Sequence, residues 1–256
     1  MIIAVVNTKG GVGKTTTAVN LAAALAGPRT RVLLVDLDSQ ASASRSCGVP
    51  RRSLRPSAGS CLLEKYPISK AIRHTATPHL DLLTGSVELA NADVALCTVR
   101  GRERALRGML ASVEGHYDCI ILDCPPGLSL LGVNALVAAD ALLVPVAPEP
   151  LGADALASLI GSIDLVRSRM GVRAQLLGIL LTMLDARRAR MSEVAERIRA
   201  EHRDTVFHTE IRWASALMDA PAAGKTVFDA APRSNAADAF RRLAGEVLHR
   251  LPALRH

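Results

Sequence analysis

Short apolar runs alternate with longer helical patterns along the whole chain. The short runs are rich in Ile, Val and Leu and predict buried strands at 2–6, 31–36, 80–84, 119–123, 141–146 and within 174–184. Helical patterns separate or follow them at 14–26, 88–97, 101–113, 128–139, 151–169, 190–203 and 234–250. Most of these strands are apolar throughout, so both faces of their sheet should be covered by helices.

This succession of strand and helix predicts an α/β fold. We expect a doubly wound, mostly parallel sheet with helices on both faces. No repeat, low-complexity tract or long linker divides the chain, so residues 1–256 are expected to form a single domain. The least regular segment is 45–79, which carries seven basic residues against one acid, Glu64.

Composition narrows the possible partners. With 49% hydrophobic and 21% charged residues, the chain has the makeup of a folded protein rather than a disordered one. Aromatic residues are only 2%, too few for stacking the bases of single-stranded nucleic acid. The net charge of +7 favours an anionic partner. Of the 31 basic residues only five are lysines, and the rest are arginines.

Cysteine usage and the N-terminus favour the cytoplasm. The five cysteines are odd in number and form no C-x-x-C pair, which argues against a disulfide framework or a zinc site. The first residues lack the basic region and cleavage site of a signal peptide. The most apolar stretch, 125–148, is interrupted by Ser129, Asn134 and Asp140, so we expect a helix and a strand there rather than a membrane span.

The strongest chemical signal is a glycine-rich loop between the first strand and the first helix. It predicts a phosphate site, because glycines let successive backbone N–H groups surround a phosphate at a helix N-terminus. Lys14 would reach the β and γ phosphates, and the Thr15 hydroxyl would bind Mg²⁺. The strict G-x-x-x-x-G-K-[ST] pattern fails at one position, Thr8, and an extra lysine follows it at Lys9. The expected ATP-binding residues are Lys9, Gly10, Gly11, Val12, Gly13, Lys14, Thr15 and Thr16.

Taken together, these motifs resemble the ParA/MinD family of P-loop ATPases. KGGVGKTT resembles the family's deviant Walker A motif, and VDLDSQ (35–40) resembles its D-x-D-P-Q segment. IILDCPPG (120–127) resembles its Walker B segment, and the later stretches 182–187 and 223–247 also match. The resemblance covers nearly the whole chain and implies an ATPase that uses ATP and Mg²⁺.

The resemblance also implies roles for individual residues. Lys14 would hold phosphates within its own subunit, whereas Lys9, the family's signature lysine, would reach across a homodimer. Asp38, taken to end the second strand, would orient the attacking water, which makes Lys9, Lys14 and Asp38 the catalytic set. Asp123 would hold Mg²⁺ through water, together with Thr15. Asp36 is expected to contact the residues that bind the nucleotide and Mg²⁺ rather than these ligands themselves.

Adenine recognition is left open by the sequence. Many family members carry P-R-N after the last core strand, where this chain has Arg212, Trp213 and Ala214. The family's asparagine contact is therefore missing or replaced. Thr182, Asp185 and the loop near Pro221 are alternatives.

Arginines gather late in the chain, and two interpretations remain open for them. One is a solvated helix face; the other is a surface that follows the phosphates of duplex DNA without reading its sequence. We take Arg187, Arg188 and Arg190 to precede a helix that contains Arg197 and Arg199. The family's DNA-contacting arginine corresponds to Ala216, so the candidate DNA-binding residues are Arg187, Arg188, Arg190, Arg197, Arg199 and Arg212.

Three functions are compatible with the motifs. The resemblance is greatest to a partitioning ATPase that dimerises with ATP, binds non-specific double-stranded DNA on the nucleoid and hydrolyses ATP slowly until a ParB-like protein stimulates it. A MinD-like ATPase would need a C-terminal amphipathic helix for a membrane, but Pro252 interrupts the tail. A metabolic P-loop ATPase would need a second substrate pocket. The replicon that such a partitioning ATPase would segregate is either a chromosome or a plasmid.

Overall fold

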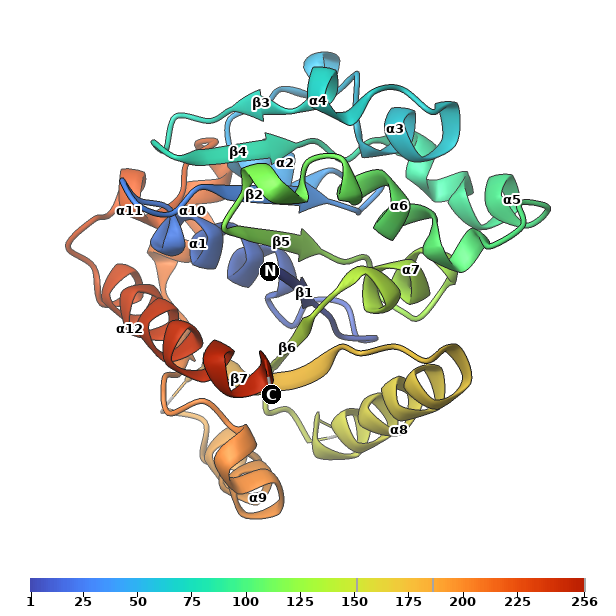
Figure 1. Cartoon of the computed structure of the whole chain (residues 1–256). Coiled ribbons are helices and arrows are strands. Elements are labelled where there is room, and N and C mark those ends of the chain that lie inside the picture. Colours follow the sequence, from blue (N-terminus) through green and yellow to red (C-terminus); the bar gives the residue numbers. More distant parts are fainter. Residues whose placement is uncertain (151, 186, 256) are drawn as a thin grey trace.

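The computed structural model describes residues 1–150, 152–185 and 187–255, and within these ranges eight strands form one sheet (Figure 1). The strand order is β3-β4-β2-β5-β1-β6-β7-β8, and only β3 pairs with its neighbour in an antiparallel sense. The strands are β1 (Ile2–Val5), β2 (Val32–Asp36), β3 (Arg73–His74), β4 (Leu80–Leu83), β5 (Cys119–Asp123), β6 (Ala141–Val146), β7 (Gln175–Leu184) and β8 (Ile211–Arg212). The predicted doubly wound, mostly parallel sheet is confirmed.

Helices cover both faces of this sheet (Figure 1). The α-helices are α1 (Lys14–Leu25), α2 (Ser42–Ser46), α3 (Ala58–Glu64), α4 (Ile68–Ala71), α5 (Ala92–Leu96), α6 (Ala105–Ala111), α7 (Leu130–Ala138), α8 (Gly152–Met170), α9 (Ala189–His202), α10 (Ser215–Ala222), α11 (Val227–Ala230) and α12 (Asn235–Arg250). Short 3₁₀ helices span Arg51–Ser53, Val87–Asn91, Arg102–Arg104, Glu114–His116, Arg203–Thr205 and Leu251–Arg255.

Two hydrophobic cores lie on opposite faces of the sheet, because successive side chains of a strand point to opposite faces. Ile2 and Ala4 of β1 belong to the core beneath α3 to α9. Ile3 and Val5 belong to the core beneath α1, α2, α10, α11 and α12. All four side chains are fully buried, which explains why the strand pattern is apolar at every position.

The predicted elements are found with end shifts of a few residues, except in two helical stretches. Where continuous helices were expected at 88–97 and 101–113, the chain forms a 3₁₀ turn followed by a short α-helix in each case. The helix expected at 151–169 is observed as Gly152–Met170, and position 151 lies outside the described residues. The sequence pattern missed the short elements β3, β8, α2, α3, α4, α10 and α11.

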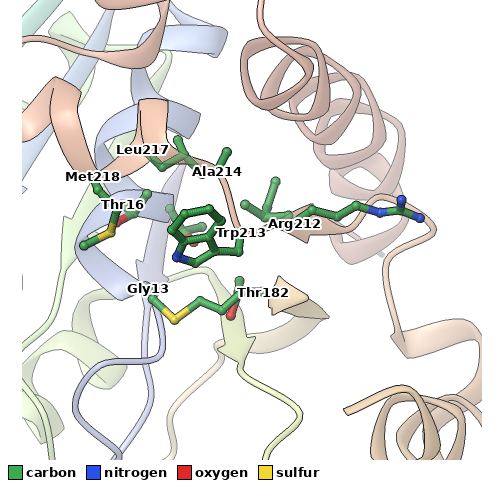
Figure 2. A pocket seen from close by; sticks show the side chains of 11 residues that line it. Gly13, Thr16, Thr182, Arg212, Trp213, Ala214, Leu217 and Met218 are labelled. Carbon is green, nitrogen blue, oxygen red and sulfur yellow. The ribbon is translucent and has the colours of Figure 1, made fainter. Parts of the chain in front are cut away.

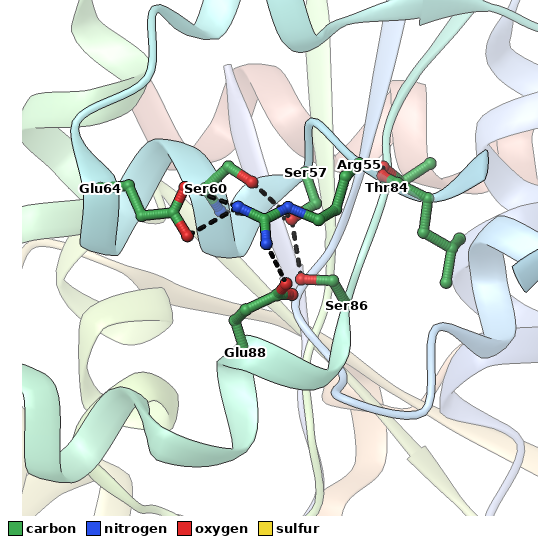
Figure 3. A network of polar contacts seen from close by, with 8 residues as sticks. Arg55, Ser57, Ser60, Glu64, Thr84, Ser86 and Glu88 are labelled. Atoms are coloured by element: carbon green, nitrogen blue, oxygen red, sulfur yellow. Dashed lines mark hydrogen bonds and ion pairs between the residues drawn. The ribbon is translucent and has the colours of Figure 1, made fainter. Parts of the chain in front are cut away.

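Residues 45–79 are more ordered than expected, because a polar network fastens this segment to the sheet (Figure 3). Arg55 forms ion pairs with Glu64 at 2.7 Å and with Glu88 at 3.0 Å. The Ser57 hydroxyl lies 2.7 Å from that of Ser86, which follows β4. At least one arginine of this segment, Arg55, is therefore engaged in ion pairs within the same chain.

Candidate functional site

The glycine-rich loop leaves β1 at the carboxyl edge of the sheet and turns into α1. Gly11 and Gly13 have φ angles of 74° and 83°, which side chains with a Cβ rarely adopt. Gly13 is the N-cap of α1, so the N-terminal N–H groups of the helix face the loop. Such a loop presents N–H donors and the positive end of a helix to an anion.

Two polar side chains outside the loop hold it against the sheet. The Asn7 amide donates to the Pro145 carbonyl at 2.7 Å, and its oxygen accepts from the Lys9 N–H at 2.9 Å. From β7, the Thr182 hydroxyl donates to the Val12 carbonyl at 2.8 Å. Sequence reasoning missed Asn7 because no motif singles it out, and it considered Thr182 only for adenine.

Lys14 is buried at the start of α1. Its Nζ donates to the Lys9 carbonyl at 2.8 Å, across the loop. Burial lowers the pKa of this ammonium, although the carboxylate of Asp123 acts in the opposite direction. An anion bound in the loop would be a further negative partner of Lys14 and would raise the pKa of its ammonium.

Asp123 ends β5 in a position that suits a metal ion. The side chain is fully buried, and neither carboxylate oxygen has a hydrogen-bond partner among the described residues. Burial raises its pKa well above the ordinary range, and the nearby charge of Asp36 adds to the effect, while the Thr15 hydroxyl opposes it. Oxygen donors of this kind suit Mg²⁺, which takes one or two carboxylates and completes its shell with water and phosphate. The residues present therefore fit the predicted magnesium site.

Asp36 and Asp38 differ from each other in surroundings. Asp38 does not end the strand as expected: β2 ends at Asp36, and Asp38 lies two residues further, half-buried in the following loop. Asp36 is fully buried and accepts hydrogen bonds from the Ser44 N–H at 2.8 Å, the Ser44 hydroxyl at 2.7 Å and the Asp38 N–H at 3.1 Å. Asp36 thus anchors the loop that carries Asp38.

Lys9 lies at the surface of the loop, in contrast to Lys14. Its ammonium forms an ion pair with Glu149, which follows β6 in the same chain. Both side chains are about half exposed, so this pair is a weak restraint in water. Lys9 is therefore able to exchange Glu149 for another anion.

One large cleft brings most of the predicted residues together. It has a volume of about 830 Å³ and is open to solvent. Asp38, Met218 and Pro221 line it together with the loop, whereas Lys9, Val12 and Asp123 are not among its lining residues. The Thr182 hydroxyl donates to the Val12 carbonyl of the loop, and Asp185 forms an ion pair with Arg187. The loop residues that line the cleft are Gly10, Gly11, Gly13, Lys14, Thr15 and Thr16.

The predicted DNA-binding arginines are mostly paired with acids. Arg187 and Arg188 both contact Asp185, and Arg197 contacts Glu201 and Asp154. Arg199 pairs with Glu196 and Glu210, and Arg212 lies 3.9 Å from Glu210. Arg190 is part of α9 rather than preceding it, and it has no ion-pair partner among the described residues. The six residues therefore do not form one uniform positive surface.

Within the described part of the chain, no helix combines the length and the apolar composition that a bilayer span requires.

Comparisons with known proteins point to one family. A family model described as an AAA domain matches residues 1–176. The chromosome-partitioning ATPase Soj of Thermus thermophilus is 43% identical over 255 residues, covering 97% of this chain and 96% of its own. The sporulation initiation inhibitor protein Soj of Bacillus subtilis is 39% identical over 246 residues, covering 96% and 97%.

Solved structures agree in fold. A Mycobacterium smegmatis structure, named cobyrinic acid a,c-diamide synthase with bound ATP analogue and magnesium, superposes with a TM-score of 0.86 at 33% identity. The match covers 98% of this chain and 94% of that one. In that protein, an ATP analogue and magnesium are bound within this fold.

Proposed function

The chain belongs to the ParA/Soj family of chromosome-partitioning P-loop ATPases, and we propose that its ATP-bound form is a homodimer that binds double-stranded DNA without sequence specificity. It is an ATPase whose cofactors are ATP and Mg²⁺. All described strands join one sheet, which supports our expectation that residues 1–256 act as a single domain.

Within one subunit, the loop N–H groups and Lys14 hold the phosphates, and Thr15 with Asp123 holds Mg²⁺. Bound Mg²⁺ would neutralise charge on the phosphates. Asp38 orients the attacking water from the loop that Asp36 anchors. This assignment is supported by the cleft that Lys14, Thr15 and Asp38 line, and by the Asp123 carboxylate, which has no hydrogen-bond partner among the described residues.

Lys9 supplies the dimer contact. One lysine of the loop, Lys14, is already buried and directed across it, whereas the exposed Lys9 has Glu149 as its one ion-pair partner among the described residues. A second point cation that reaches the partner's phosphates would couple dimer formation to ATP. This exposed lysine beside a complete phosphate loop is the observation that carries the proposal.

Dimerisation would double the number of arginines that can contact DNA phosphates, so DNA binding becomes dependent on ATP. Hydrolysis separates the subunits and releases the DNA. We propose that hydrolysis is slow until a ParB-like partner stimulates it, and that the protein works in the cytoplasm on the nucleoid. The relatives' names as Soj and chromosome-partitioning proteins support this cycle.

The test measures dimer formation by sizing chromatography and retention of unrelated DNA duplexes, with ATP, ADP or no nucleotide, at low and high salt. We expect ATP-specific dimers and salt-sensitive, sequence-blind retention. Lys9→Ala should bind ATP but form no dimer. Lys70→Ala is the matched control, because Lys70 is an exposed lysine that does not line the cleft. Normal ATP-dependent dimerisation of Lys9→Ala would contradict the proposal.

Two alternatives have distinct outcomes in the same experiment. Binding to anionic lipid vesicles without DNA retention would favour a MinD-like membrane cycle. The structural neighbour named as a diamide synthase gives the metabolic alternative a concrete form. ATP consumption that depends on cobyrinic acid and an amide donor, with no DNA retention, would favour it.

A further inference from the structure

The loop that carries Asp38 forms a tight turn. The Asp38 carbonyl accepts from the Ala41 N–H at 3.0 Å, and the Asp38 carboxylate accepts from the Gln40 N–H at 2.9 Å. Ala41 has a φ of 51°, in the left-handed region that residues with a Cβ seldom adopt. Such a conformation persists where the surrounding structure fixes it, so contacts from outside the turn must hold Asp38 in place.

A chain of hydrogen bonds makes these contacts, with the Ser44 hydroxyl at its middle. This hydroxyl accepts from the Gly85 N–H at 2.9 Å and donates to one carboxylate oxygen of Asp36 at 2.7 Å. The other carboxylate oxygen of Asp36 accepts from the Asp38 N–H at 3.1 Å. A hydroxyl can accept and donate at once, whereas an alanine at position 44 would deprive the buried Gly85 N–H of this acceptor.

Gly85 adds a close approach that leaves no room for a side chain. Strands β2 and β4 are parallel neighbours, so the turn after β4 lies beside the loop after β2. A Cβ on Gly85 would lie 2.6 Å from the Asp38 carbonyl oxygen and 2.7 Å from a carboxylate oxygen of Asp36, closer than real Cβ atoms come. The φ of Gly85 lies outside the left-handed region, so the close approach, rather than the backbone conformation, requires glycine here.

From these contacts we infer that Ser44 and Gly85 are positioning residues for ATP hydrolysis, which fix the backbone of Asp38 and so direct its carboxylate at the attacking water. The inference rests on the role proposed above for Asp38. Neither Ser44 nor Gly85 is among the residues that line the cleft. Their substitution should therefore change the rate of hydrolysis rather than ATP affinity, because a displacement of about 1 Å at a reacting group can lower a rate about 100-fold.

The experiment measures single-turnover ATP hydrolysis with Mg²⁺ by the full-length protein, and ATP affinity by calorimetry. Binding is also followed by the emission of Trp213, the chain's one tryptophan, which lines a pocket together with Gly13 and Thr16 of the phosphate loop (Figure 2). Ser44→Ala and Gly85→Ala should each lower the hydrolysis rate at least about tenfold and keep ATP affinity within about threefold of the parent. Ser44→Thr retains the hydroxyl and should recover most of the rate.

A crowded glycine elsewhere in the sheet separates positioning from a general loss of structure. Gly178 lies in β7, which three strands separate from β2, and a Cβ there would lie 2.6 Å from the Phe207 ring and 2.9 Å from the Thr205 carbonyl oxygen. Gly178→Ala should lower Tm, as Gly85→Ala does, because both overpack buried positions. Its hydrolysis rate per folded molecule should nevertheless stay within about threefold of the parent.

A second background tests whether Ser44 acts through Asp38. In Asp38→Ala the carboxylate is already absent, so adding Ser44→Ala should lower the residual hydrolysis rate by less than about twofold. A further loss as large as the one that Ser44→Ala causes in the parent would show that Ser44 acts by another route, and would overturn the inference.

Other outcomes would also overturn the inference while leaving the proposed function in place. Parent-like hydrolysis by Ser44→Ala is one, and it decides the case even if Gly85→Ala fails to fold. A fall in rate that only follows a fall in ATP affinity is another, as is an equal loss in Ser44→Thr. The proposed function fails separately if the parent protein binds no ATP, or if Asp38→Ala hydrolyses ATP at the parent rate.

Discussion

At the scale of single residues, the buried carboxylate of Asp123 is a group of this site that destabilises the ligand-free protein. Its carboxylate is fully buried without a hydrogen-bond partner among the described residues, and burial raises its pKa well above the usual value. An unsatisfied buried polar group costs about 1–3 kcal/mol of stability. The ligand-free chain therefore holds a destabilised group that Mg²⁺ and nucleotide can stabilise.

Asp123→Asn should make the ligand-free protein more stable at neutral pH. The folded-state pKa is raised, so above about pH 4 the unfolded chain releases this proton while the folded chain resists doing so, and stability falls as pH rises. The substitution removes that loss and should raise Tm by several degrees, equivalent to about 1–3 kcal/mol. Thermal unfolding checks this, and the gain should vanish below about pH 4.

The same substitution at Asp36 serves as the control. Asp36 is equally buried, but one of its oxygens accepts from Asp38 and the other from Ser44. An asparagine would place its NH₂ against one of these N–H donors, so Asp36→Asn should lower Tm. Mg²⁺-dependent stabilisation by ATP should be lost in Asp123→Asn. Retention of that stabilisation, or a lower Tm for Asp123→Asn, would remove Asp123 from the magnesium site.

At the scale of elements, regular spacing was easier to predict than local chemistry. The buried strands and long helices follow from periodicity, because both cores select apolar residues at fixed intervals. Asp38 was misplaced by two residues, since a strand pattern does not show where pairing stops. The irregular pairing of β7 with β8 carried no recognisable signal, because only tertiary pairing creates it.

The helix α9 shows why charge counts alone mislead. Its arginines attract attention in the sequence, yet Arg197 pairs with Glu201 and Asp154, and Arg199 pairs with Glu196 and Glu210. An arginine held by acids must exchange them before it can contact a DNA phosphate. Arg190 has no such partner within the described ranges.

Arg190→Ala should therefore weaken DNA binding more than Arg197→Ala. Removing one phosphate contact lowers the slope of log affinity against log salt by about one per subunit, uniformly across DNA sequences. The measurement is DNA affinity of the ATP-bound protein at several salt concentrations. Equal slopes for Arg190→Ala and the parent protein would show that Arg190 does not contact a DNA phosphate.

At the scale of the whole molecule, the nucleotide site joins the two cores. The phosphate loop connects β1, which contributes to both cores, with α1, which packs on one face only. Thr182 of β7 and Asn7 then tie the loop to strands on the side of the sheet beyond β1. A ligand bound at the loop thus contacts structure that depends on both faces of the sheet.

This arrangement predicts that Mg²⁺ and ATP stabilise the chain as a unit. Calorimetry should show one unfolding transition, and saturating Mg²⁺–ATP should move all of it upward, by an amount that grows with ligand concentration as binding to the folded state alone requires. At about 100 times the dissociation constant the gain is about 2.7 kcal/mol. Thr182→Val, which removes the hydroxyl that holds Val12, should reduce the ligand-induced shift more than it reduces the ligand-free Tm. If the transition instead splits, with only the earlier part responding to ATP, the two cores unfold separately and the loop belongs to just one of them.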